Sequence, residues 1–345
     1  MTTMEYRVLG RTGLKVSKLC LGTMMFGSWG TSDQGDVTKI IGTALDAGVN
    51  FLDTSDNYSG GESEELVGRA LADLGARDRV VLATKCHMPM GEDPNSRGNS
   101  RRWIFQEVEN SLRRLGTDWI DLYQIHRPDL TTDIDETLGA LTDLVRAGKI
   151  RYFGTSTFPA HLLVEAHWTS QFRARERFVC EQAPYSLLVR GVEGDVLPVC
   201  EKLGTGVITW SPLAGGWLSG TYRKDRELPF TIRSFVLPER YDMRLSENQR
   251  KLEAVEAFAE LAERTDVSLI ELSLAFVLQH PAVTSVIIGP RTAEHLDSQL
   301  SAAEVSLGAD VLDEIDRIVP PGVTLNPHDA GWRHPALEDQ ARRRR

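Results

Sequence analysis

Residues 49–58 read Val-Asn-Phe-Leu-Asp-Thr-Ser-Asp-Asn-Tyr. The apolar run from Val49 to Leu52, with the turn residue Gly48 before it, is typical of a buried strand. It places Asp53 at the C-terminal end of the strand and Tyr58 in the polar loop that follows. Because a carboxylate is costly to bury alone, we expect Asp53 to have a cationic or hydrogen-bonding partner. A solvated loop carrying an ordinary surface tyrosine is the alternative interpretation of this stretch.

Apolar runs like Val49–Leu52 recur along the chain, and most of them are followed by a segment with the pattern of a helix. Eight such runs in roughly 300 residues favour an α/β fold that closes into a (β/α)8 TIM barrel over a doubly wound sheet. A Rossmann fold would need Gly-x-Gly-x-x-Gly after the first strand, and Gly22 to Gly27 does not supply it. The predicted strands are Lys18–Thr23, Val49–Asp53, Val80–Lys85, Trp119–His126, Ile150–Thr155, Arg177–Gln182, Gly206–Trp210 and Val283–Ile288.

Three segments lie outside this repeat. Residues 6–16 predict a β-hairpin at the N-terminus. The loop Ser211–Ser246 is too long for a simple connector, and loops of this length are usually functional lids or disordered. We expect one barrel domain over residues 1–319 and an extended C-terminal tail over residues 320–345, which ends in the basic run Arg342–Arg345.

Composition narrows the classes of function. The net charge of −10 argues against a nucleic-acid-binding or anionic-membrane-binding surface. No apolar run is long enough to span a membrane and no secretory leader is evident, so we expect a cytoplasmic protein. The four cysteines are widely separated and lack metal-ligand spacing, which is consistent with a reducing compartment and predicts no metal. The sequence leaves the oligomeric state open.

Polar side chains follow three neighbouring predicted strands. Asp53, Lys85 and His126 stand at strand ends, where barrel enzymes carry their active sites, and Tyr58 lies in the loop after the first of them. An ammonium next to a phenol lowers the phenol pKa, and a carboxylate keeps that ammonium charged. His126 could orient the group that accepts the proton. The four residues therefore predict a general acid that protonates a developing alkoxide, with the hydride supplied by a cofactor.

The chain resembles the aldo-keto reductase family from about Tyr6 to about Ile318. The matching motifs are Leu52–Tyr58, Thr84-Lys85, Asp121–His126, Gly154–Ser156, Glu181–Ser186 and Trp210–Gly216. The resemblance implies NADPH-dependent reduction of an aldehyde or ketone to an alcohol, without metal. Its catalytic residues would be Asp53, Tyr58, Lys85 and His126.

The resemblance also implies a binding site for NADPH. Ser156 and Gln182 would bind the nicotinamide carboxamide, Trp210 would stack on the ring, and Arg291 would bind the 2′-phosphate. Two departures from the family pattern stand out: Thr157 replaces an asparagine, and Ser298-Gln299 replaces the Glu-Asn pair of many relatives, so the carboxylate contact to the adenine amine is lost. The full set of expected cofactor residues is Ser156, Gln182, Trp210, Ser211, Leu213, Gly215, Gly289, Arg291, His295 and Gln299.

The substrate is expected to contact Met24, Trp29 and His87, with Met88 and the loop around residues 217–241 nearby. Trp29 could instead be a plain core residue. A small-molecule carbonyl compound is the predicted partner, and a nucleotide-activated keto-deoxysugar is an alternative substrate by analogy with actinobacterial relatives. Two other classes stay open. One is a nucleotide-binding accessory subunit, like the potassium-channel β-subunits that share this fold. The other is an unrelated barrel that uses Asp and His as metal ligands.

Overall fold

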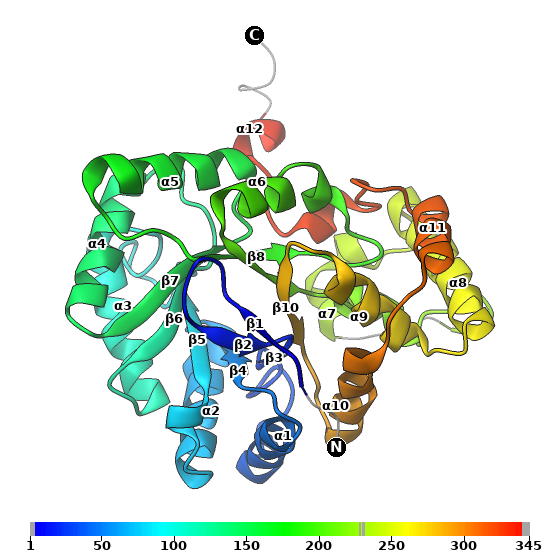
Figure 1. Cartoon of the computed structure of the whole chain (residues 1–345), viewed down its shortest axis with the longest axis horizontal. Coiled ribbons are helices and arrows are strands. Elements are labelled where there is room, and N and C mark those ends of the chain that lie inside the picture. The colour runs from blue at the N-terminus through cyan, green and yellow to red at the C-terminus, as the bar shows by residue number, and fades with distance from the viewer. Residues whose placement is uncertain (1–3, 228, 230–231, 340–345) are drawn as a thin grey trace.

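Eight parallel strands close into a barrel in the computed structural model of this chain (Figure 1). The structure describes residues 4–227, 229 and 232–339. The strand order around the barrel is β10-β3-β4-β5-β6-β7-β8-β9, which confirms the predicted (β/α)8 TIM barrel. The barrel strands are β3 (Leu19–Gly22), β4 (Phe51–Asp53), β5 (Val81–Cys86), β6 (Ile120–Ile125), β7 (Ile150–Ser156), β8 (Cys180–Pro184), β9 (Gly206–Trp210) and β10 (Val283–Ile288).

Helices cover the outside of the barrel, and most begin at side chains that satisfy free backbone N–H groups. Asp33, Ser100 and Asp133 each accept a hydrogen bond from the first turn of the helix that follows. Among the described residues, no helix is both long and apolar enough to cross a membrane. The helices are α1 (Gln34–Asp46), α2 (Glu62–Asp73), α3 (Arg101–Leu115), α4 (Ile134–Arg146), α5 (Ala160–Arg173), α6 (Val196–Leu203), α7 (Ile232–Val236), α8 (Ser246–Arg264), α9 (Leu269–Gln279), α10 (Ala293–Leu300), α11 (Ala309–Ile318) and α12 (Pro335–Glu338).

The hydrophobic core has two parts. The larger fills the space between the strands and the helices, and the smaller fills the barrel interior with residues such as Phe51, Leu122 and Ile208. The hairpin formed by β1 (Tyr6–Val8) and β2 (Lys15–Ser17) covers the N-terminal end of the barrel (Figure 1). Leu9 and Val16 are fully buried in the inner core. The N-terminal end of the barrel is therefore closed. The C-terminal rim is the end at which an active site is expected.

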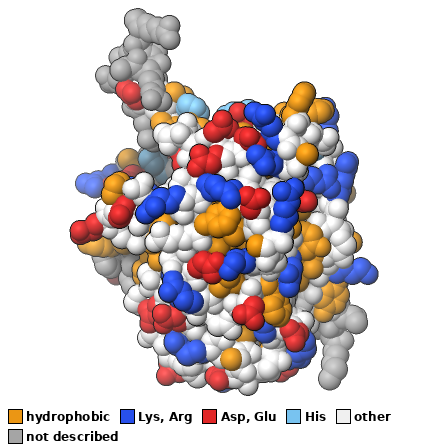
Figure 2. Space-filling model, turned by 90° about the vertical axis from the view of Figure 1, so that its left-hand side faces the viewer, with side chains coloured by type: hydrophobic (Ala, Val, Ile, Leu, Met, Phe, Trp, Pro, Cys, Tyr) orange, Lys and Arg blue, Asp and Glu red, His pale blue; other side chains and the backbone are white. Residues whose placement is uncertain are grey.

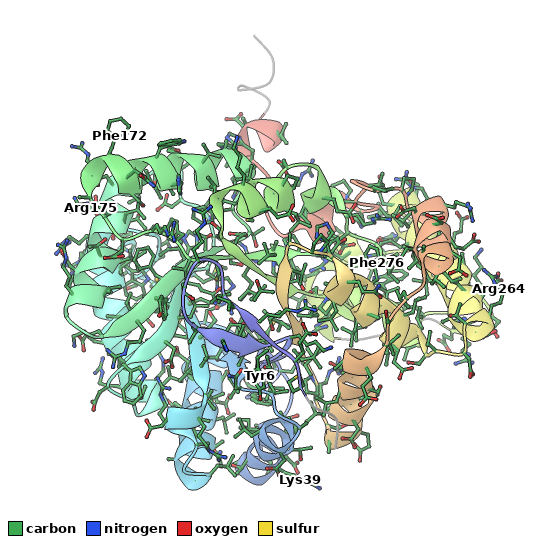
Figure 3. The ribbon with its side chains drawn as sticks, viewed as in Figure 1. Tyr6, Lys39, Phe172, Arg175, Arg264 and Phe276 are labelled. Atoms are coloured by element: carbon green, nitrogen blue, oxygen red, sulfur yellow. The ribbon has the colours of Figure 1, made fainter. Side chains whose placement is uncertain are left out.

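Side-chain contacts tie the hairpin and the outer helices to the barrel. The hydroxyl of Tyr6 donates to the carbonyl of Gly48, in the turn before β4 (Figure 3). Arg175, just after α5, pairs with Asp135 of α4 at 3.0 Å. Acidic and basic side chains are interspersed over this side of the molecule (Figure 2). Exposed pairs of this kind contribute little stability each, so the fold depends mainly on its core.

The predicted long loop between β9 and α8 contains short helical turns. They are η4 (Ala214–Ser219), α7 and η5 (Pro238–Arg240). The C-terminal segment, which we expect to be extended, also contains helical turns, η7 (Pro327–Ala330) and α12.

One buried carboxylate joins the C-terminal segment to the long loop. Asp329 lies 2.7 Å from Lys251 Nζ and 2.5 Å from Arg240 Nε. Lys251 is fully buried and requires such a counter-charge, which explains why this part of the tail is packed rather than extended. A domain boundary at residue 319 stays a prediction, and the basic run Arg342–Arg345 lies outside the described residues.

Candidate active site

The C-terminal ends of β4, β5 and β6 bring three of the predicted catalytic residues together. Asp53 is the last residue of β4, Lys85 lies at the end of β5, and His126 directly follows β6. Tyr58 begins the turn η1 (Tyr58–Gly61) after β4. These strands are neighbours in the barrel, so residues far apart in the chain share one rim.

Lys85 is the centre of the hydrogen-bond network. Its Nζ donates to Asp53 Oδ2 at 2.5 Å, to the carbonyl of Thr54 at 2.7 Å and to the Tyr58 hydroxyl at 3.3 Å. An ammonium has three hydrogens, and three acceptors surround it. Lys85 and Asp53 are buried and Tyr58 is half-buried, which leaves the phenol as the member of this group that faces the rim.

Two amides hold the other oxygen of Asp53. Gln124 Nε2 and Gln182 Nε2 donate to Asp53 Oδ1 at 3.0 Å and 2.9 Å. Sequence reasoning did not single out Gln124, although a polar residue inside the apolar run of β6 was a signal. Gln182 is an expected cofactor residue, and its amide nitrogen is engaged by this carboxylate. Its amide oxygen is the atom left for a ligand.

The pKa of the Tyr58 hydroxyl has several opposing causes. Burial raises it, the charge of Lys85 lowers it, and the charge of Asp53 raises it further. The predicted lowering by Lys85 is therefore present but outweighed, and the net pKa lies above the ordinary value for tyrosine. Burial alone would lower the pKa of Lys85, but Asp53 and Tyr58 raise it overall. At neutral pH the pair is a charged ammonium beside a protonated phenol.

His126 lies against the phenol. The two ring centroids are 6.0 Å apart in an edge-on arrangement, and His126 Nδ1 lies 3.1 Å from Ser55 Oγ. Burial, together with the charges of Arg127, Lys85 and His87, lowers the pKa of His126 well below its usual range. The imidazole is therefore neutral at neutral pH and carries one N–H.

The expected nicotinamide contacts lie on the neighbouring strands. Ser156, the last residue of β7, and Gln182, in the middle of β8, are register partners, and Ser156 Oγ donates to the carbonyl of Gln182. Trp210 ends β9, and its indole Nε1 is buried without a hydrogen-bond partner in the described part of the chain. The guanidinium of Arg127 lies 5.8 Å from the Trp210 ring, a contact that sequence reasoning missed.

The loop after Trp210 contains several residues in the left-handed region of the backbone. Ser211, Ala214, Gly215 and Gly216 all have positive φ, and Leu213 lies half-buried between them. Seven non-glycine residues of the described chain have positive φ, and five of them lie in loops after β4, β5, β7 and β9. Strained backbone conformations of this kind cluster at functional sites, so their positions support the C-terminal rim of the barrel as the candidate active site.

The last group of expected cofactor residues follows β10. Gly289 and Arg291 lie in the loop, where the Thr31 hydroxyl donates to the Arg291 carbonyl, and the exposed His295 lies in the first turn of α10. Gln299 is buried, and its Oε1 has no hydrogen-bond partner among the described residues. Arg233 of α7 was not predicted. Burial and the nearby charges of Arg291 and Arg240 lower its pKa, which marks a cluster of cations there.

Of the expected substrate residues, Trp29 lies beside the phenol. Trp29 is 41% exposed, with its ring centroid 6.2 Å from that of Tyr58, so it lies at the mouth of the site and is not a core residue. Met24 is half-buried in the same loop. His87 directly follows β5, and its Nδ1 lies 2.8 Å from Asn99 Oδ1.

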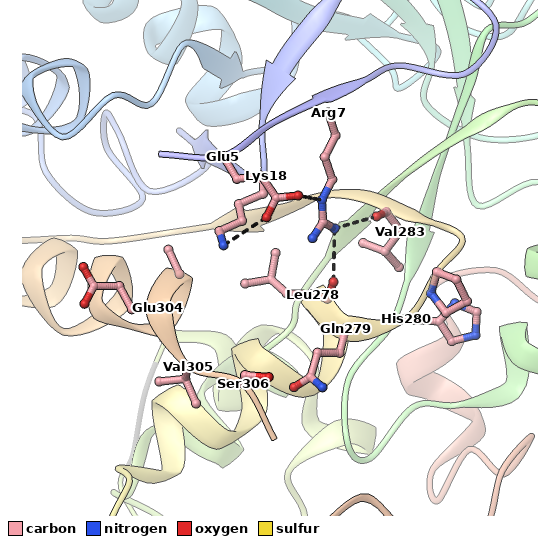
Figure 4. A pocket seen from close by; sticks show the side chains of 12 residues that line it. Glu5, Arg7, Lys18, Leu278, Gln279, His280, Val283, Glu304, Val305 and Ser306 are labelled. Carbon is pink, nitrogen blue, oxygen red and sulfur yellow. Dashed lines mark hydrogen bonds and ion pairs between the residues drawn. The ribbon is translucent and has the colours of Figure 1, made fainter. Parts of the chain in front are cut away.

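A hollow of about 450 Å³ lies at the other end of the barrel, beside the hairpin (Figure 4). Three of its charged side chains form ion pairs, since Glu5 pairs with Arg7 at 2.9 Å and with Lys18 at 3.3 Å. Arg7 also donates to the carbonyls of Leu278 and Val283. These groups are already paired, and the rim is the better candidate. Across the described ranges, no three His, Cys, Asp or Glu side chains are grouped so that they could hold a metal ion.

Comparison with known proteins gives a consistent result. Residues 18–320 match the model of the aldo/keto reductase family. The uncharacterized oxidoreductase YrpG of Bacillus subtilis is 40% identical over 339 residues, covering 95% of this chain and 100% of that protein. A protein named probable voltage-gated potassium channel subunit beta from Oryza sativa is 36% identical, over 92% of this chain and 97% of its own. The norsolorinic acid reductase of Emericella nidulans is 33% identical, with coverages of 91% and 81%.

Proposed function

The chain belongs to the aldo/keto reductase family, and from this premise we propose that it reduces an aldehyde or ketone to an alcohol with NADPH as the hydride donor and Tyr58 as the general acid. One observation carries the proposal. A single buried ammonium, that of Lys85, donates both to Asp53 and to the Tyr58 hydroxyl. An ion pair with a purely structural role would not need the phenol as a further partner of the ammonium. A phenol that donates a proton does need the ammonium beside it, because the positive charge stabilises the phenolate.

Tyr58 can supply a proton at neutral pH because its hydroxyl stays protonated in the buried site. When the proton leaves, the phenolate forms next to the Lys85 ammonium, whose charge stabilises it. Asp53 keeps that ammonium charged and fixed in place. General acid catalysis of this kind typically contributes ~10²–10⁴ in rate.

His126 is proposed to hold the carbonyl oxygen near the phenol. Its ring is neutral and lies edge-on to Tyr58, so one ring N–H can donate to an acceptor between them. A neutral donor orients the carbonyl without adding another positive charge beside those of Lys85 and Arg127. Trp29 then forms an apolar wall at the mouth.

The residues at the rim fit NADPH. Bound there, the cofactor supplies hydride. Gln299 offers a buried oxygen that has no hydrogen-bond partner within the described ranges, which suits the adenine amine, and the amide oxygen of Gln182 suits the carboxamide. Arg291, with Arg233 nearby, gives positive charge for the 2′-phosphate, and guanidinium binds phosphate in a bidentate manner. Ser156 and the backbone from Ser211 to Gly215 are proposed to complete the site.

A nucleotide-binding accessory subunit is the second candidate, favoured by the 36% identity to the rice protein named as a channel β-subunit. Turnover separates the two functions. The purified chain is mixed with NADPH and a panel of aldehydes and ketones, including aromatic and sugar-like compounds, and loss of NADPH absorbance is followed. Many turnovers per chain support the reductase. Oxidation that stops at one equivalent, or none at all, would favour the accessory subunit.

A further inference from the structure

The hydroxyl of Ser55 lies within hydrogen-bond distance of three side-chain atoms. Asn57 Oδ1 is 2.8 Å away, Asp56 Oδ1 is 3.0 Å away and His126 Nδ1 is 3.1 Å away. Ser55 and Asp56 are fully buried in the turn after β4, and His126 is almost so. The contact to His126 links this turn to a residue of the proposed mechanism.

The number of hydrogens restricts this cluster. A serine hydroxyl has one hydrogen to donate and two lone pairs that accept. With three polar neighbours, Ser55 can donate to one of them, and the other two must donate to Ser55. If they did not, Ser55 Oγ would face another acceptor, an oxygen or an unprotonated nitrogen, with no hydrogen between them. In a buried site such an unsatisfied contact costs free energy.

Asp56 is one of the donors. Its Oδ2 is buried and has no hydrogen-bond partner in the described part of the chain, which does not suit a carboxylate anion. The carboxyl groups of Glu64 and Glu107 are its charged neighbours, and their countercharge Arg114 bonds to those two groups. Burial and these two like charges raise the pKa of Asp56 well above its usual range. Asp56 therefore holds a proton that it can donate to Ser55 Oγ.

Two arrangements of the remaining hydrogens are then left. If Asn57 accepts from Ser55, His126 must carry its hydrogen on Nδ1, and Nε2 is bare. If the Asn57 amide is turned so that Nδ2 donates, Ser55 donates to His126 Nδ1, and the hydrogen of His126 is on Nε2. The oxygen and nitrogen of an amide exchange places by a half-turn, so both arrangements fit the same heavy-atom positions.

We propose that Ser55 is a positioning residue that fixes neutral His126 as the Nε2–H tautomer, with the uncharged acid of Asp56 and the amide of Asn57 as donors to Ser55 Oγ. The choice between the two arrangements rests on the proposed function, because a carbonyl oxygen accepts hydrogen bonds and only an Nε2–H can donate to it. Ser55 then acts through His126 and touches neither substrate nor cofactor.

The tautomer can be measured directly in the intact chain. Nitrogen-15 NMR of labelled histidine distinguishes protonated from bare ring nitrogens, and the signals of His126 are identified by their loss in His126→Asn. We expect Nε2 to be protonated and Nδ1 bare in the wild-type chain. A protonated Nδ1 with bare Nε2 overturns the proposal, whatever the variants do.

Kinetics of two Ser55 variants provide the second test. Ser55→Ala is expected to lower kcat about tenfold with NADPH affinity unchanged and to leave His126 a mixture of tautomers, since one neutral hydrogen bond is lost. Ser55→Thr keeps the hydroxyl and is expected to restore both the kcat and the single tautomer. Equal losses in the two variants would overturn the role of the hydroxyl. An Nε2–H tautomer in a chain that turns over no carbonyl compound would refute the proposed function alone and leave the positioning role intact.

Discussion

Lys85 Nζ lies 2.5 Å from Asp53 Oδ2, and both side chains are sealed from water. The pair bridges the ends of the neighbouring strands β4 and β5. Replacing a buried ion pair by apolar residues is often neutral or stabilising, so stability alone is a weak reason for this one. Its position at the rim, with a phenol as the third partner of the ammonium, is better explained by chemistry.

The first prediction concerns this pair. Asp53→Asn leaves the Lys85 ammonium without its counter-charge and should lower the free energy of unfolding by about 3–5 kcal/mol, measured by urea denaturation. The double variant Asp53→Asn/Lys85→Met removes both charges and should recover most of that stability. It should not recover aldehyde reduction, because the phenolate would then form without a cation. A single variant as stable as the wild type would show that the pair is not a coupled buried unit.

The second prediction concerns the proposed acid. Tyr58→Phe keeps the ring beside His126 and removes only the hydroxyl, so NADPH affinity should stay within about threefold while kcat falls by ~10²–10⁴. Stopped-flow kinetics and a fluorescence titration separate the two quantities. Tyr6→Phe, which removes a tyrosine hydroxyl from the hairpin at the other end of the barrel, is the matched control and should keep its kcat. Unchanged turnover in Tyr58→Phe would remove this residue from the mechanism.

The third prediction concerns cofactor choice. If Arg291 binds the 2′-phosphate, Arg291→Ala should weaken NADPH roughly tenfold, the size of a lost charge-assisted contact, and leave NADH almost unchanged. Fluorescence titrations with both nucleotides measure the ratio. Arg264→Ala removes an exposed arginine at the end of α8 and should change neither affinity (Figure 3). Equal losses for NADPH and NADH would show that Arg291 does not touch the 2′-phosphate.

The barrel and the meeting of four side chains could be predicted because both depend on patterns along single strands. Each apolar run marked a strand, and the parallel order placed Asp53, Lys85 and His126 at one rim. What could not be predicted depends on contacts between distant segments. Gln124 and Gln182 bind Asp53 from inside the barrel, and no local pattern indicates that both amides point to one carboxylate.

Burial explains most of the other differences. A phenol next to an ammonium was predicted to have a lowered pKa, but the depth of the site outweighs the charge of Lys85, and depth is not visible in a sequence. Similarly, the C-terminal segment was expected to be extended because it is rich in proline and ends in a basic run. Asp329 is buried because Lys251, far away in the chain, is buried beside it. No element was predicted over residues 309–318, where charged and apolar residues are mixed, and α11 forms there and packs through Ile315.

The fourth prediction concerns pH. Glu181 is fully buried, and burial raises its pKa from 4.5 to about 7. Between these two values the folded chain keeps a proton that the unfolded chain releases, so the stability from this group is present below about pH 4.5 and is lost as the pH rises to 7. The loss should be roughly 3 kcal/mol. Glu181→Gln should flatten this part of the curve of unfolding free energy against pH.

Glu165 on the exposed face of α5 provides the control for this measurement. Glu165→Gln changes the net charge by the same amount but removes a solvated carboxyl group, so its stability curve should run parallel to that of the wild type. If Glu181→Gln and Glu165→Gln give the same slope between pH 4.5 and 7, Glu181 does not titrate near 7 in the folded chain.

The last prediction concerns Trp210, the ring proposed to stack on the nicotinamide. Gly331 of the C-terminal segment packs flat against it, and a methyl group there would lie 2.5 Å from Trp210 Cζ2 and 2.7 Å from Cη2. Gly331→Ala must therefore displace the indole or the segment, which should change the tryptophan fluorescence and weaken NADPH binding by about tenfold. Gly322→Ala is closely matched, because φ is +77° there and +76° at Gly331, yet its methyl group would meet no atom within 4 Å. Both variants bear the cost of a left-handed alanine, roughly 1 kcal/mol, so both should lose that stability. Only Gly331→Ala should lose affinity for the cofactor, and equal affinities in the two variants would show that the position of Trp210 does not control cofactor binding.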